Sequence, residues 1–224
     1  MSAGANVGPE EVSPDPRGRW TRLGLIAVVV LVATVGGYLL GSMRASSTPG
    51  DRSVEAGFTR DMVVHHGQAV EMAEIVRDRT NDEAIRILAT DIALTQQAQI
   101  GRFQGWLDAW GLPARGIDEA MAWMGHPTPG AMPGMASADD VASLMGLDPA
   151  EMDVRFLQLM IPHHQAAILM ADEVLTQTDR PEVLTLAEGI SSAQQAEIEY
   201  MQDLLRQRGA EETEPPVTMP SMDG

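Results

Sequence analysis

The sequence contains no cysteine and no lysine, and it has few aromatic residues. Without cysteine the chain can form neither a disulfide nor a thiolate metal site, and it offers no attachment point for a lipoprotein anchor. All 15 basic residues are arginines, and 32 acidic residues outnumber them, which gives a net charge of −17 at pH 7. This charge argues against a nucleic-acid partner, because phosphate binding requires a basic surface. An aromatic content of 4% with 15 methionines favours packed helices over a sheet.

One long apolar run, residues 23–43, contains no charged residue and is long enough to cross a bilayer core of roughly 30 Å. Arg17, Arg19 and Arg22 precede it, so the positive-inside rule favours a cytoplasmic, disordered segment at 1–22. We therefore expect a single transmembrane helix in contact with the lipid bilayer, a location in the cell membrane and an extracytoplasmic C-terminal domain. The alternative is a cleaved signal peptide, although the run is longer than a usual signal-peptide core.

The remainder of the chain contains a tandem duplication. Residues 58–107 and 156–205 align without gaps, and 18 of the 50 aligned positions are identical. Each copy carries a pair of adjacent histidines between two methionines, and each carries a Gln-Gln-Ala sequence further along. The chain is therefore expected to contain two similar structural units.

Each unit has the periodicity of a helical hairpin. Apolar residues and histidines recur at steps of four and three from Phe58 to Val76, which predicts one face of a helix. Asn81 and Asp82 predict a turn and the start of a second helix, and Pro149 and Pro181 begin the helices of the second copy. An αα-hairpin with a single apolar face is not stable alone, so the two hairpins should pack against each other.

The predicted fold is therefore all-α: a ferritin-like four-helix bundle with one long crossover, preceded by the transmembrane helix. The bundle should span residues 53–208, with repeats at 53–110 and 149–208. The crossover at 111–148 is rich in Gly, Pro and Met, and residues 209–224 form a disordered tail.

Folding each hairpin about its turn brings His65 to the level of Gln96, and His163 to the level of Gln194. A polar layer of these four side chains should therefore cross the bundle. One interpretation is that His and Gln satisfy each other and fix the register of the helices. The other is a metal site with these glutamines as supporting residues, because methionines lie three and four residues before the histidines and face the same side of the helix.

Thioether sulfur and imidazole nitrogen together favour copper, especially Cu(I). The candidate metal ligands are the paired residues of the two repeats: His65, His66, Met62, Met72, His163, His164, Met160 and Met170. The crossover supplies a second set of candidates, which are Met121, Met124, His126, Met132 and Met135. Single methionine pairs of this kind are more often hydrophobic anchors, but methionines in a poorly packed segment can also bind Cu(I).

Several enzyme classes lack their motifs here. A di-iron bundle site requires inward Glu residues and Glu-x-x-His, whereas Met62 and Met160 stand three residues before His65 and His163. The sequence has no His-Glu-x-x-His zinc motif, no phosphate-binding loop and no Gly-x-Ser-x-Gly elbow. We therefore name no catalytic residue.

The paired Met-x-x-His-His-x5-Met motifs, which begin at Met62 and Met160, resemble those of domain-of-unknown-function family 305 (DUF305). The resemblance covers about residues 53–208. It implies an exported or membrane-anchored, ferritin-like bacterial bundle, and some members are described as periplasmic copper-binding proteins with Met and His ligands. It would place copper ligands at the eight repeat residues named above, and it brings no enzymatic activity with it.

The sequence thus predicts a membrane-anchored copper-binding protein for metal tolerance or trafficking. One alternative is a structural or partner-binding bundle without metal, and another is weak redox activity at a bound metal. Whether the chain forms a homo-oligomer or has a membrane partner stays open.

Overall fold

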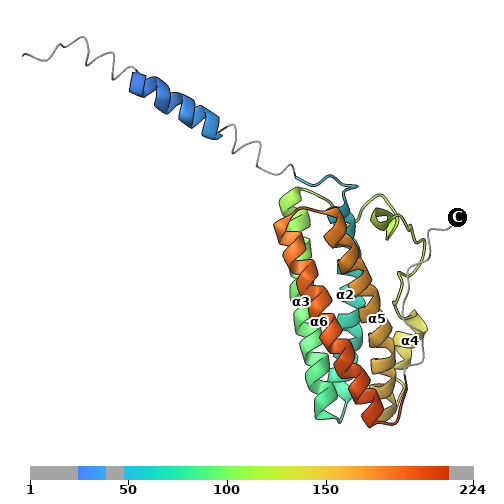
Figure 1. The fold of residues 1–224 in the computed structure, drawn as a ribbon. Coiled ribbons are helices and arrows are strands. Elements are labelled where there is room, and N and C mark those ends of the chain that lie inside the picture. Colours follow the sequence, from blue (N-terminus) through green and yellow to red (C-terminus); the bar gives the residue numbers. More distant parts are fainter. Residues whose placement is uncertain (1–24, 39–47, 212–224) are drawn as a thin grey trace, which may run out of the picture. The chain divides into compact units, whose positions relative to one another are not determined.

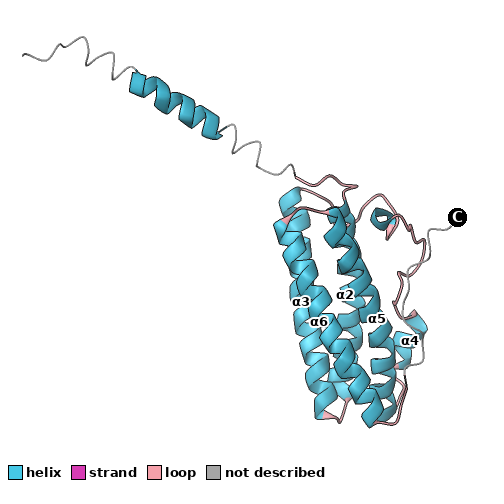
Figure 2. Ribbon diagram, in the orientation of Figure 1, coloured by secondary structure: helices cyan, strands magenta, loops and turns pink. Residues whose placement is uncertain are grey.

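The computed structural model describes residues 25–38 and 48–211, and these residues are helical with no strand beyond one isolated bridge between Ala120 and Thr128 (Figure 2). The predicted all-α class is therefore confirmed. From residue 48 onwards the helices are α2 (Val54–Arg79), α3 (Glu83–Trp110), the 3-10 turn η1 (Ala122–Met124), α4 (Ala138–Ser143), α5 (Pro149–Gln177) and α6 (Pro181–Gln207). The predictions of disorder at 1–22 and in the tail from 212 onwards concern residues outside the described ranges.

The prediction of a transmembrane helix at 23–43 is wrong, and so is the cell-membrane location that depended on it. In the described part of the chain, no helix is both long enough and apolar enough to span a membrane. The residues described as helical in this region are 25–38. The rest of the apolar run lies outside the described residues. The segment up to Thr48 is a unit separate from the compact unit that begins at Pro49.

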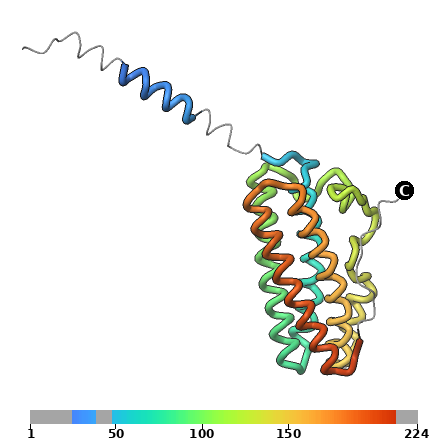
Figure 3. Tube along the Cα trace, in the orientation of Figure 1, coloured from blue at the N-terminus to red at the C-terminus, as the bar shows by residue number. Residues whose placement is uncertain are grey.

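Four long helices make up the compact unit. Helices α2 and α3 form one hairpin, α5 and α6 form the other, and α2 packs against α5 (Figure 1). The trace in Figure 3 shows that the chain reverses within each hairpin, while the crossover between them returns along the outside of the helices. As a result α3 and α5 run in the same direction, and α2 and α5 run in opposite directions.

Local sequence explains where the helices begin and end. The Ser53 side chain accepts a hydrogen bond from the Ala56 backbone at the start of α2, and the Asp82 side chain does the same for Ala84 at the start of α3. Gly111 ends α3 in the left-handed conformation with φ of 69°. Helix α5 continues through Pro162, which lies in its interior.

The duplication appears as two reciprocal hydrogen bonds between the hairpins. Thr80, at the end of α2, donates to Asp153 near the start of α5 at 2.9 Å. Thr178, at the end of α5, donates to Glu55 near the start of α2 at 2.6 Å. Both threonines and both acids are equivalent in the repeats, so the two hairpins are related by an approximate two-fold axis. These bonds hold α2 and α5 together at both ends.

The core has two apolar clusters with a polar layer between them. One cluster lies toward the turns after α2 and before α5 and contains Met72 and Met160. The other lies toward the opposite end and contains Met62 and Met170. Each cluster thus receives one motif methionine from each repeat. The buried polar residues at intermediate positions along the four helices are His65, His66, Gln96, His163, His164 and Gln194.

The crossover is bonded to α2 and packs closely against α5 at the level of the histidines. Gln68 on α2 makes two hydrogen bonds to the backbone of Ala136, at 2.8 and 2.9 Å. Gly134 has φ of 74° and lies so close to α5 that an added Cβ would be 2.4 Å from the Pro162 carbonyl oxygen. The expectation of a poorly packed crossover is therefore wrong for this segment.

Candidate metal site

His65 and His163 lie face to face at the centre of the polar layer. Their ring centroids are 3.8 Å apart, and the ring planes are inclined by 37°. Helix α2 supplies one ring and α5 the other, and both side chains are fully buried. The duplicated sequence therefore brings its two equivalent histidines into direct contact.

Neither ring makes a hydrogen bond of normal geometry among the described residues, although the Pro133 backbone lies near enough to His65 to act on its pKa. Both nitrogens of His65 and both nitrogens of His163 are buried and unsatisfied. Burial lowers the pKa of His65 to about 3, and the nearby His66 contributes to the fall, while the Pro133 carbonyl offsets a small part of it. Burial also lowers the pKa of His163 well below its usual value. At neutral pH both imidazoles are therefore uncharged, and each has a lone pair available to a cation.

The second histidine of each pair turns toward the edge of the bundle and has a partner. His66 Nε2 lies 2.8 Å from Gln99 Oε1, and His164 Nε2 lies 2.7 Å from Glu197 Oε2. In both residues the Nδ1 atom remains buried without a partner. Burial lowers the pKa of His66 to about 4, and its hydrogen bond with Gln99 opposes this shift. All four histidines thus keep at least one buried, unpartnered nitrogen.

Gln96 and Gln194 lie buried at the level of the histidines, where pairing within the hairpins placed them. They do not satisfy the histidines, however. Both polar atoms of the Gln96 side chain are unpartnered, and so is Oε1 of Gln194. A layer that served only to fix helix register would be expected to satisfy its own polar groups, because unpaired buried groups each cost about 1–3 kcal/mol.

The motif methionines are buried on the two sides of the layer. Met62, Met72 and Met160 have no exposed surface, and Met170 is 1% exposed. Met62 precedes His65 by three residues on α2, and Met160 precedes His163 by three residues on α5, so each thioether lies on the same helix face as an imidazole. All eight predicted ligands are therefore buried, the histidines in the polar layer and the methionines in the apolar clusters on either side of it.

The crossover methionines have a different environment. Met121, Met124 and Met132 are buried in the second apolar cluster, and Met135 packs against it. His126 is partly exposed. Three of these methionines therefore act as hydrophobic anchors of the crossover, and the five residues do not form a separate exposed group.

The donors in the layer fit a soft cation better than a hard one. In the described part of the chain, no three His, Asp or Glu side chains come together as a zinc or di-iron site would require. The available donors are imidazole nitrogens and thioether sulfurs, which suit Cu(I). Unpartnered, uncharged imidazoles beside buried methionines therefore have the chemistry for a copper ion.

Sequence reasoning missed Gln99 and Glu197. They follow Gln96 and Gln194 by three residues, and they occupy equivalent positions in the two repeats. Each also follows its histidine partner by 33 residues, and this repeated spacing is the signal that could have identified them. Both positions are partly exposed, where a polar side chain is ordinary and does not by itself indicate a site.

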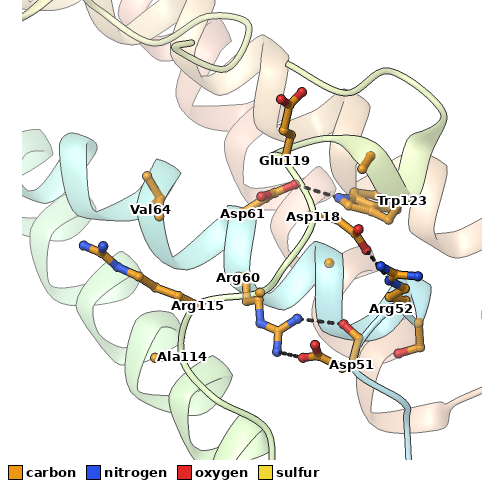
Figure 4. A pocket seen from close by; sticks show the side chains of 14 residues that line it. Asp51, Arg52, Arg60, Asp61, Val64, Ala114, Arg115, Asp118, Glu119 and Trp123 are labelled. Atoms are coloured by element: carbon orange, nitrogen blue, oxygen red, sulfur yellow. Dashed lines mark hydrogen bonds and ion pairs between the residues drawn. The ribbon is translucent and has the colours of Figure 1, made fainter. Parts of the chain in front are cut away.

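A surface pocket of about 330 Å³ lies beside the start of α2, apart from the histidines (Figure 4). Asp61 in its wall accepts hydrogen bonds from the Met121 backbone and from the Trp123 indole, both at 2.8 Å. Arg60 bonds to Asp51 and to the Pro113 carbonyl. These polar groups bind the crossover to α2. The residues that line the pocket therefore have a structural role.

Several solved structures share this fold. A crystal structure of a DUF305 protein from Streptomyces coelicolor, described as secreted, is 46% identical, with a TM-score of 0.71; the match covers 74% of this chain and all of that one. CopM in the Cu(II)-bound form is 29% identical, with a TM-score of 0.55, over 69% of this chain and 97% of CopM. CopM in the Cu(I)-bound form is 26% identical, with a TM-score of 0.51, over 71% and 97%.

A curated relative, an uncharacterized protein of Acanthamoeba polyphaga mimivirus, is 39% identical over 51 residues, which is 23% of this chain and 34% of that protein. The chain thus spans about a third of this relative. The family model described as "Domain of unknown function (DUF305)" matches residues 55–205, which include both hairpins and the crossover. The chain belongs to the DUF305 family.

Proposed function

We propose that this protein binds copper in the histidine layer between α2 and α5, and that it serves copper tolerance or trafficking. The observation that carries the proposal is the contact between His65 and His163, two buried imidazoles with four unpartnered nitrogens. A bundle that needed only stability would gain from apolar residues at these positions. A ligand that binds to the two imidazoles explains why the bundle has histidines at these positions.

The arrangement of the helices supports a ferritin-like bundle as the scaffold. Two hairpins joined by one long crossover, with α3 and α5 running in the same direction, are the connectivity of that class (Figure 1). In this scaffold, ligands for a metal come from facing helices. The proposed ligands are drawn from the four histidines and the four motif methionines of α2 and α5; because no three of the histidines converge on one point, any one copper ion would be held by at most two imidazoles together with methionine sulfur.

Copper is the preferred metal for two reasons. The donor set is imidazole and thioether, which suits copper and, among its oxidation states, Cu(I) in particular. CopM, which shares the fold at 26–29% identity, is described in Cu(I)-bound and Cu(II)-bound forms, and also in a silver-bound form. A bound copper ion would replace the hydrogen bonds that the imidazole nitrogens lack.

The test is a titration of the purified full-length protein with Cu(I) against a competing chelator. The comparison variant carries alanine at His65, His66, His163 and His164, and His126→Ala is the control for a histidine outside the layer. We expect tight binding in the wild type and in the control, and its loss in the fourfold variant. Retained binding in the fourfold variant would move the site to the methionines of the crossover, and absent binding in the wild type would refute the copper function.

A further inference from the structure

The two repeats differ at a position that hydrogen-bonds to a histidine of the candidate site. His66 and His164 are equivalent, fully buried, and bonded through Nε2 to residues of the neighbouring helix. The partner is an amide in the first repeat, Gln99, and a carboxylate in the second, Glu197. The geometry is nearly the same in both repeats, at 2.8 and 2.7 Å, so the difference is one of chemistry.

A carboxylate constrains an imidazole more strongly than an amide does. An ionised carboxylate only accepts hydrogen bonds, so the bond with Glu197 requires a proton on Nε2 of His164. An amide both donates and accepts, and Gln99 can therefore bond to either tautomer of His66. The lone pair of His164 is thus held on Nδ1, which is buried and unpartnered, whereas the tautomer of His66 is not fixed.

The charge of Glu197 has a second effect. A carboxylate bonded to the far nitrogen of an imidazole ligand increases the electron density at the coordinating nitrogen and counters the charge of the metal. The Glu197 side chain is 23% exposed and His164 is fully buried, so the pair spans the boundary between solvent and the layer. The second repeat therefore offers a cation one negative charge that the first repeat lacks.

We propose that Glu197 is a positioning residue that fixes His164 with Nδ1 free for a metal, and that it makes the second repeat the half of the site with the stronger preference for Cu(II). The inference rests on the proposed copper function. A dication gains more than a monocation from a nearby negative charge. Cu(I), which relies more on thioether sulfur, should therefore respond less to the residue at position 197.

The chain provides its own matched substitutions. Glu197→Gln gives the second repeat the partner that the first repeat has, and Gln99→Glu does the reverse, with little change in side-chain volume. We expect Glu197→Gln to weaken Cu(II) binding about 10- to 100-fold, which is the usual effect of removing such a partner. Cu(I) affinity should change less than threefold. Gln99→Glu should strengthen Cu(II) binding, and its combination with Glu197→Gln should restore it.

A measurement on metal-free protein separates this inference from the copper function. Nitrogen-15 spectra of the imidazole rings in the full-length protein should show His164 protonated at Nε2, and Glu197→Gln should allow the other tautomer to appear. A proton on Nδ1 of His164 in the wild type would overturn the positioning role even if copper binds tightly. A Cu(II) affinity in Glu197→Gln within twofold of the wild type would overturn the preference. Absence of copper binding in every variant would refute the copper function, while the spectra would still decide the positioning role.

Discussion

His65 and His163 face each other across the interface of α2 and α5, with ring centroids 3.8 Å apart and no hydrogen bond to any of their four nitrogens. Two neutral imidazoles in this arrangement lose their contacts with water and gain no polar partner in return. The bundle retains this unfavourable pair in the middle of its core, between two apolar clusters.

Replacing both stacked histidines with leucine should stabilise the metal-free protein. The double variant His65→Leu with His163→Leu removes buried unsatisfied groups, so its free energy of unfolding in urea should rise by about 1–2 kcal/mol. The same variant should lose copper binding. A fall in stability of that size would mean that the layer supports the bundle by itself, as a register device would.

The motif methionines should matter for Cu(I) and much less for Cu(II). Met62→Leu and Met160→Leu conserve volume in fully buried positions, so each should cost less than about 1.5 kcal/mol of stability. Each should weaken Cu(I) binding at least tenfold, because leucine has no donor atom. Met152→Leu is the control, since Met152 is also fully buried on α5 but lies outside the motifs. Equal Cu(I) affinities in all three variants would exclude thioether ligands.

Gly134 should be essential for packing the crossover against α5. Gly134→Ala places a Cβ against the Pro162 carbonyl and forces alanine into a positive φ, so we expect a loss of about 2–4 kcal/mol. Gly125→Ala is the control, because Gly125 has φ of 80° but open space around it; its cost should be about 1–2 kcal/mol. Thermal unfolding of both variants measures the difference. Similar losses would show that the close contact with α5 contributes nothing.

The equivalent acids Glu55 and Asp153 should have opposite effects on the pH dependence of stability. Burial raises the pKa of Glu55, but its hydrogen bonds and Arg180 outweigh burial, so the net pKa is lowered. Its stabilising effect is present above about pH 4.5 and is lost as pH falls through the lowered value. For Asp153 burial dominates and the net pKa is raised. Its contribution is complete below about pH 3.8 and is lost as pH rises through the raised value.

Glu55→Gln should therefore destabilise the protein near neutral pH, and Asp153→Asn should stabilise it, each by roughly 1 kcal/mol. Both differences from the wild type should shrink as the pH approaches 3. Urea unfolding of the three proteins between pH 3 and pH 7.5 measures them. Parallel stability curves would show that neither carboxyl changes its pKa on folding.

The sequence was sufficient to predict the helical hairpins and the level of the histidines. The reason is geometric: a short turn fixes how two antiparallel helices pair, so His65 and Gln96 had to lie at one level. The partners of the outer histidines were not predicted, because Gln99 and Glu197 lie at partly exposed positions where polar residues are ordinary. The packing of the crossover against the helices was not predicted either. It depends on Gly134 and Gln68, and these residues follow no periodic pattern.

The apolar run at 23–43 shows a different limit. Its hydropathy predicted a membrane span, but the helix described there covers only residues 25–38. A spanning helix requires about 20 apolar residues in one helix, and no helix in the described part of the chain meets both conditions.

The most direct test of the account is anomalous X-ray scattering at the copper edge from crystals of the full-length protein loaded with Cu(I). We predict an anomalous peak within the bundle, between α2 and α5 at the level of His65 and His163, with imidazole nitrogen and methionine sulfur as its nearest neighbours. Crystals in which copper is bound only at surface carboxylates or in the crossover, with the two histidines stacked as before, would contradict the account.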